Sequence, residues 1–158
     1  MCGRSSGSRV REDLYRRVIL DRYQAPAHRG SLQDANACAE AHNPLCGDEI
    51  TISARVDGNT IEEVAWEGMG CSILYASADL MADALQGRTI EEADRLFEGV
   101  EAMLQGSEGA TLDLGELAVL DGVRRYPARV RCALLPWKTL REALGDRRAP
   151  LQAEPNEG

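Results

Sequence analysis

The sequence predicts an α+β protein in which a small antiparallel sheet of about three strands packs against helices, with a helical C-terminal half. Three patterns support this prediction. An amphipathic segment lies near the start of the chain, residues 49–68 alternate in hydropathy around one turn, and the segments after residue 70 follow the helical period.

The first helix is predicted in the stretch REDLYRRVILDRYQAP and ends before Pro26, since proline has no amide hydrogen for the helical ladder. Its apolar residues recur at helical spacing: Leu14, Val18, Ile19 and Tyr23. A loop is expected to follow as far as about residue 46, with a further edge strand at residues 36–42.

A β-hairpin is predicted next. In the segment EITISAR, Ile50, Ile52 and Ala54 alternate with polar residues, as in a strand with one buried face. The turn Asp57-Gly58-Asn59 then leads into a second strand at residues 60–68.

Two helices are predicted after the hairpin, each with its own start signal. Ser72 is expected to be the N-cap of the first, which Gly87 stops. Thr89 and Glu92 form a capping box that begins the second, over residues 89–105.

The remaining segments predict shorter helices and two tails. The stretch LDLGELAVLDGV favours a short helix. Residues 124–144 favour two helical pieces, the second of which carries Ala133, Leu134, Trp137, Leu140 and Leu144 and would begin at Arg131 or at Pro136. We expect a single domain over residues 12–146, with disordered polar tails at residues 1–11 and 147–158.

Composition excludes several functional classes. The chain has 158 residues, of which 18 are basic and 26 acidic, and a net charge of −8, which disfavours binding to a nucleic acid backbone. No apolar stretch approaches the roughly 18 residues of a membrane span, and the polar N-terminus lacks a secretory apolar region. We therefore predict a cytoplasmic protein with neither nucleic acid nor membrane partners.

Cysteine usage disfavours a disulfide framework, and cysteine spacing alone is a weak signal for a metal site. The cysteines are odd in number and include no Cys-x-x-Cys pair, which is atypical of disulfide scaffolds, zinc knuckles and thioredoxin-like motifs. They are Cys2, Cys38, Cys46, Cys71 and Cys132. No role is assigned to Cys2 or Cys38.

Three of the cysteines lie at predicted element ends. Cys46 precedes the first hairpin strand in the motif Cys-Gly-Asp, Cys71 lies between the hairpin and a helix, and Cys132 lies near the start of the last helix. Each taken alone is more typical of a buried core thiol. As a set, with Asp48 as a carboxylate of the kind zinc accepts, they favour a metal site.

Basic residues precede the third cysteine of that set: Arg124, Arg125, Arg129 and Arg131. Three thiolates and one carboxylate around a divalent ion would leave a negative site, which guanidinium groups could offset. We assign that role to Arg125 and Arg131, and expect Arg124 and Arg129 on a solvated helix face.

Four motifs then carry a resemblance over residues 12–145: LYRRVILDRYQAP, NPLCGD, GMGCSI and RVRCALLPW. In this order they resemble the U-type iron–sulfur assembly family, which includes IscU, SufU and the N-terminal domain of NifU. The chain is most similar to the SufU branch. Arg131 replaces a histidine of the IscU branch, RRYPARV replaces its chaperone-docking Leu-Pro-Pro-Val-Lys, and the additional stretch EAMLQGSEGATLDLG is a SufU feature.

The resemblance implies a fold, a metal and a reaction. The SufU/IscU-like fold would hold zinc through Cys46, Asp48, Cys71 and Cys132. A pyridoxal-phosphate-dependent cysteine desulfurase of the SufS type would donate persulfide sulfur to Cys46, after a desulfurase histidine replaces that cysteine on the metal. The activity would be sulfurtransferase-like and would supply downstream SUF cluster-assembly proteins.

Other functions remain open at this stage. The same ligands could assemble a transient 2Fe–2S or 4Fe–4S cluster, since thiolates suit zinc and iron alike. A structural zinc module is a weaker alternative. A zinc hydrolase is weaker still, because four protein ligands would leave no open position for water.

Overall fold

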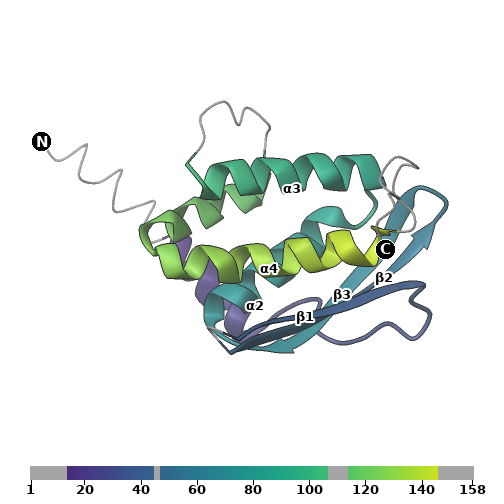
Figure 1. The fold of residues 1–158 in the computed structure, drawn as a ribbon, viewed down its shortest axis with the longest axis horizontal. Helices are drawn as coiled ribbons and strands as arrows, with labels where there is room; N and C mark the ends of the chain where they lie inside the picture. Colours follow the sequence, from purple (N-terminus) through teal and green to yellow (C-terminus); the bar gives the residue numbers. More distant parts are fainter. Residues whose placement is uncertain (1–13, 45–46, 107–113, 146–158) are drawn as a thin grey trace, which may run out of the picture.

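A computed structural model describes residues 14–44, 47–106 and 114–145 (Figure 1). A helix at residues 14–24 precedes the elements β1 (Ala37–Asn43), β2 (Asp48–Asp57), β3 (Thr60–Met69), α2 (Ser72–Leu85), α3 (Ile90–Leu104), the 3-10 helix η1 (Gly115–Arg125) and α4 (Pro127–Ala143). This order confirms the predicted α+β class. The tails predicted at residues 1–11 and 147–158 lie outside the described residues.

The three strands form one antiparallel sheet in the order β1-β2-β3. Cys38 of β1 pairs with Ser53 of β2, and Glu49 of β2 pairs with Met69 of β3. The predicted hairpin and edge strand are therefore both confirmed. Near the hairpin turn, a bulge between Arg55 and Val56 shifts the register.

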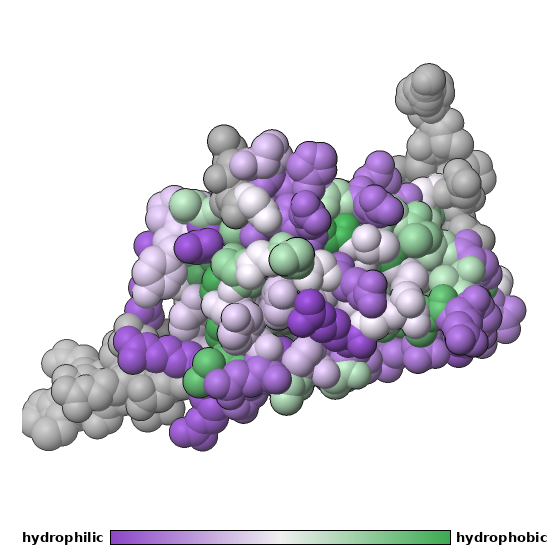
Figure 2. All heavy atoms as spheres, turned by 90° about the horizontal axis from the view of Figure 1, so that it is seen from below, coloured by the Kyte–Doolittle hydropathy of each residue, from purple (hydrophilic) through white to green (hydrophobic). Residues whose placement is uncertain are grey.

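Helices cover one face of the sheet. Helix α4 packs on β1 and β2, α2 packs on β3, and α3 and η1 pack on the helical layer (Figure 1). The largest buried side chains, including Trp66, Ile52, Leu80 and Trp137, fill the space between these layers. The other face of the sheet carries no helix in the described structure, and hydrophilic side chains are spread over it (Figure 2).

The N-terminal helix is tied to this core through a buried carboxylate. Asp79 of α2, fully buried, accepts hydrogen bonds from Arg22 (2.8 Å), the indole of Trp66 (3.0 Å) and the amides of Ala27 and His28. Burial by itself raises the pKa of Asp79, but these donors outweigh it and hold the pKa below its ordinary value. No described helix has the length and apolarity needed to cross a membrane.

The predicted helix starts are confirmed at α3 and wrong by one residue at α2. Thr89 and Glu92 form the expected capping box. At α2, by contrast, Cys71 has the extended backbone of an N-cap and Ser72 is already helical. The chain leaves β3 with a bend at Gly70, and Cys71 is extended before the helix begins.

The expected start of the last helix, at Arg131 or at Pro136, is also wrong. Helix α4 runs unbroken from Pro127 to Ala143, with Pro136 buried in its interior. Proline removes one ladder hydrogen bond and crowds the preceding turn. Burial of Pro136 against the core offsets this cost. The same part of α4 is held to α2 by a 2.6 Å hydrogen bond that the buried hydroxyl of Ser77 donates to the carbonyl of Ala133.

Candidate metal centre

The sheet register determines the position of the candidate site. Because Glu49 pairs with Met69, Asp48 at the start of β2 lies beside Gly70 and Cys71, which follow β3. Asp48 shares the inner face of the sheet with Ile50, two residues further along. The amide of Cys71 donates a 3.4 Å hydrogen bond to Oδ1 of Asp48.

Helix α4 brings the third side chain to this point. The Asp48, Cys71 and Cys132 side chains offer ligand atoms that all lie within 4.8 Å of one another. Asp48 and Cys132 are buried, whereas Cys71 is half-buried at the edge. The fourth predicted ligand, Cys46, lies outside the described residues, so its role stays a prediction. Its neighbour Gly47 has φ +73°, a backbone conformation suited to the bend expected there.

The buried thiol of Cys132 is held in its neutral form. Burial raises the pKa of Cys132 far above its ordinary value, and the adjacent Asp48 carboxylate and Cys71 thiol raise it further. A cation at the centre of the cluster would reverse this effect, because a metal ion favours the coordinated thiolate.

An oxygen of Asp48 supplies a second observation. Its Oδ2 atom is buried and has no hydrogen-bond partner among the described residues. Buried carboxylate oxygens are normally paired or bound to metal, since desolvation is otherwise uncompensated. Zinc binds thiolates at about 2.3 Å and carboxylates at about 2.1 Å. The three ligand atoms here lie within 4.8 Å of one another, close enough to converge on one ion with small side-chain adjustments. The two thiols and this carboxylate fit such an ion.

Close backbone approach makes room for the cluster. A Cβ on Gly70 would collide with Oδ1 of Asp48 and lie 2.7 Å from Cδ2 of Leu74. A Cβ on Gly68 would collide with the carbonyl of Glu49. The glycines of Gly-Met-Gly therefore let the end of β3 approach the Asp48 carboxylate.

The guanidinium that reaches the described thiols belongs to Arg129. Its electrostatic interaction with Cys71 and its hydrogen bond with Cys132 raise the pKa of Arg129. Arg129 is exposed, as expected of a residue on a solvated face, but its guanidinium also reaches the two thiols, which was not expected. Spacing could have revealed this contact, because Arg129 precedes Cys132 by three residues and residues so spaced are neighbours on a helix.

Arg125 and Arg131, predicted to compensate the charge of the site, are both exposed. Arg125 ends η1, and Arg131 lies on α4 directly before Cys132. Charge compensation by either residue stays a prediction.

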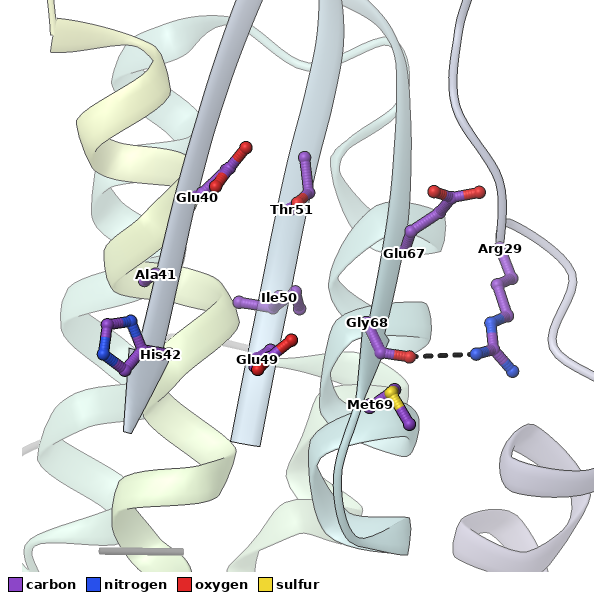
Figure 3. A pocket seen from close by; sticks show the side chains of 10 residues that line it. All are labelled: Arg29, Glu40, Ala41, His42, Glu49, Ile50, Thr51, Glu67, Gly68 and Met69. Carbon is purple, nitrogen blue, oxygen red and sulfur yellow. Dashed lines mark hydrogen bonds between the residues drawn. The ribbon is translucent and has the colours of Figure 1, made fainter. Parts of the chain in front are cut away.

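A separate hollow of about 660 Å³ lies on the outer face of the sheet (Figure 3). Glu40, Glu49 and Glu67 line it, one from each strand, together with Arg29, which donates to the carbonyl of Gly68 at 2.9 Å. Strand side chains alternate between faces, so Glu49 points away from the face that carries Asp48. The hollow is therefore not part of the metal centre.

Comparison with known proteins identifies the family to which this chain belongs. Residues 14–133 match the family model described as the NifU-like N-terminal domain. The chain belongs to this family. The predicted resemblance is confirmed over most of the chain, and the strands, α2 and the three clustered ligand groups all fall within the matched region.

Relatives within the family carry two kinds of name. The zinc-dependent sulfurtransferase SufU of Bacillus subtilis is 40% identical over 134 residues, covering 84% of this chain and 90% of that protein. The iron–sulfur cluster assembly scaffold protein IscU of Thermotoga maritima is also 40% identical, over 131 residues, covering 83% and 92%. Overall identity therefore does not separate the two branches.

A solved structure agrees with the fold. A protein from Fervidobacterium islandicum, assigned as an iron–sulfur cluster assembly scaffold for the SUF system, is 38% identical with a TM-score of 0.75. The match covers 80% of this chain and 93% of that one. A NifU-like N-terminal structure from Brucella abortus, 24% identical over 86% of this chain and 95% of that one, shares the fold at a TM-score of 0.75.

Proposed function

We propose that this chain acts in iron–sulfur cluster assembly as a zinc-dependent acceptor of persulfide sulfur. The donor is a pyridoxal-phosphate-dependent cysteine desulfurase of the SufS type, and the accepting residue is Cys46. The observation that carries the proposal is the buried Oδ2 of Asp48, which has no hydrogen-bond partner among the described residues and lies beside two thiols. The similarity to the B. subtilis sulfurtransferase supports it.

Zinc is the metal proposed for this site. Asp48, Cys71 and Cys132 would bind it together with Cys46, which is only two residues from Asp48 and hence has its Cα within about 7 Å of that residue's Cα. When bound, zinc keeps the coordinated sulfurs deprotonated without redox chemistry of its own. Arg129 contributes a fixed positive charge beside Cys71 and Cys132.

Burial supports the assignment of roles among the cysteines. Cys132 has no exposed surface, so an incoming sulfur cannot reach it without rearrangement, and Cys71 is half-buried. We therefore assign Cys132 and Cys71 to metal retention and Cys46 to sulfur acceptance.

The transfer itself conserves oxidation state. The thiolate of Cys46 attacks the outer sulfur of the desulfurase persulfide and forms a new sulfur–sulfur bond. The original sulfur–sulfur bond breaks, and its electron pair stays with the desulfurase cysteine, which leaves as a thiolate. The chain acts in the cytoplasm and passes the sulfur on to other SUF cluster-assembly proteins.

A second candidate function is a scaffold that builds a cluster on the same ligands. The chain is as similar to the T. maritima scaffold as to the B. subtilis sulfurtransferase, so the scaffold function is retained as the second candidate. Two departures from the IscU branch favour sulfur acceptance. Arg131 replaces its histidine, and RRYPARV replaces its chaperone-docking segment.

The test measures desulfurase turnover with and without the protein after its metal content has been determined. Zinc-loaded wild type should stimulate turnover and gain the mass of one sulfur atom, and Cys46→Ala and Asp48→Ala should do neither. Cys38→Ala is the matched control, because Cys38 is an exposed cysteine on β1 outside the cluster. Absent stimulation, with an iron–sulfur chromophore on reconstitution, would instead establish the scaffold function.

A further inference from the structure

A pocket of about 790 Å³ opens beside the metal centre. It lies between the N-terminal helix, the start of α2 and the junction of η1 with α4. Its apolar lining comes from all three: Tyr15, Ile19, Leu20, Ile73, Tyr126 and Pro127. Leu20 and Tyr126 are 51% and 47% exposed, so apolar surface here faces solvent.

The pocket and the metal centre share a wall. Ser72 and Ile73 line the pocket and directly follow Cys71 in α2. Arg129 also lines it, and the same guanidinium interacts with the thiols of Cys71 and Cys132. A protein that brings a sulfur atom to this centre would therefore lie next to the mouth of the pocket.

The charge at the pocket is opposite to that of the molecule. Arg16, Arg125 and Arg129 line it, and no described lining residue is Asp or Glu. The chain as a whole carries a net charge of −8. A local group of guanidinium groups on an acidic protein favours a partner surface that presents carboxylates.

We infer that this pocket is the docking site of the cysteine desulfurase, which inserts an apolar side chain flanked by carboxylates. The inference rests on the proposed function and adds the surface that recognises the partner. An apolar anchor in a desolvated pocket supplies affinity, while the arginines orient the approach and accelerate association.

The first test compares two leucines on one helix. Leu20 lines the pocket, whereas Leu14 is equally exposed at 51% and lies outside it. Calorimetric titration of zinc-loaded protein into the desulfurase should give at least tenfold weaker binding for Leu20→Ser, because buried anchors dominate interfaces. Leu14→Ser should bind like wild type. Zinc content and circular dichroism, measured for both variants, check that the fold is intact.

The second test compares two arginines on the same helix. Arg16→Glu should slow association with the desulfurase several-fold, and the difference should shrink as salt is added, because ions screen exposed charges. Arg17→Glu changes an exposed residue outside the pocket and should have a smaller effect.

The outcomes separate the two proposals. If wild type neither binds nor stimulates the desulfurase, the proposed function fails and this inference with it. If wild type stimulates turnover but Leu20→Ser binds as tightly as Leu14→Ser, the docking site is overturned while the function stands. If Leu20→Ser changes only self-association in light scattering, the pocket is an interface between copies and the inference is again overturned.

Discussion

At the scale of single residues, we expect Asp48 to destabilise the metal-free fold but to contribute to zinc binding. Its carboxylate is 1% exposed, and one of its oxygens has no hydrogen-bond partner in the described structure. Asp48→Asn keeps the shape and removes the charge. We expect the metal-free variant to be as stable as wild type or about 1 kcal/mol more stable, since a buried unpaired charge is destabilising.

The same substitution should weaken zinc binding at least tenfold, because an amide is a poorer ligand than a carboxylate. Urea unfolding of the metal-free proteins and a chelator competition titration measure the two effects separately. A variant that loses stability without metal yet binds zinc normally would show that Asp48 has only a structural role.

Gly70 offers a steric test of the same site. In Gly70→Ala the added Cβ collides with the Asp48 carboxylate, and overpacking of this kind costs about 1–3 kcal/mol. Zinc affinity should fall because the carboxylate must move. The matched control is Gly145→Ala, whose Cβ meets no atom within 4 Å. Equal zinc affinities for the two variants would contradict the proposed geometry.

Residues differed in how far the sequence could predict their roles. Asp48, Cys71 and Cys132 stand in recognisable motifs, and their side chains do converge. The contact between Arg129 and the thiols was missed, because the last helix was expected to begin after Arg129, whereas α4 begins at Pro127 and carries both Arg129 and Cys132. The collision that Gly70 avoids depends on a side chain 22 positions away along the chain, which no local pattern encodes.

At the scale of elements, the start of α3 should behave as a coupled unit. The amide of Glu92 donates to the Thr89 hydroxyl, and the Glu92 carboxylate accepts from the Thr89 amide. Thr89→Ala should lower the free energy of unfolding by about 1 kcal/mol. Combined with Glu92→Ala in a double-mutant cycle measured by urea unfolding, the losses should be less than additive. Fully additive losses would show that the two bonds are independent.

Elements set by local signals were predicted well, and those set by tertiary contacts were not. The hairpin and the α3 capping box depend on residues close in sequence. The continuity of α4 through Pro136 depends instead on burial against the core, where Ser77 of α2 donates to the carbonyl of Ala133, 56 residues later in the sequence. Local propensity therefore indicated a break that packing overrides.

At the scale of the whole molecule, Asp79 joins the N-terminal helix, β3 and α2. Asp79→Asn removes the charge that faces Arg22 and should lower the free energy of unfolding at pH 7 by about 3 kcal/mol. Asp83→Asn is the control. Asp83 lies one turn further along α2 and also pairs with Arg22, but it is 48% exposed, so its loss should cost less than about 1 kcal/mol.

The effect should also depend on pH. Because the folded-state pKa of Asp79 is lowered, the carboxylate stabilises the fold fully above its unfolded pKa of about 3.9. That stabilisation is lost as the pH falls through the folded pKa. The gap in unfolding free energy between wild type and Asp79→Asn should therefore narrow below about pH 4 in urea titrations. A gap independent of pH would indicate that packing, not charge, is responsible.

The hairpin register restricts which insertions and deletions the hairpin can accept. Asp48 lies eight residues before Val56, an even number, so both side chains point to the inner face of the sheet. The bulge at Arg55/Val56 lies near the opposite end of the strand, about 26 Å from Asp48. A single codon lost or gained between the two, if absorbed by slippage, would exchange the faces of Asp48 and Glu49. Natural length variation in this hairpin should therefore occur in steps of two residues or be accompanied by a moved bulge, although the tip carries none of the proposed metal ligands.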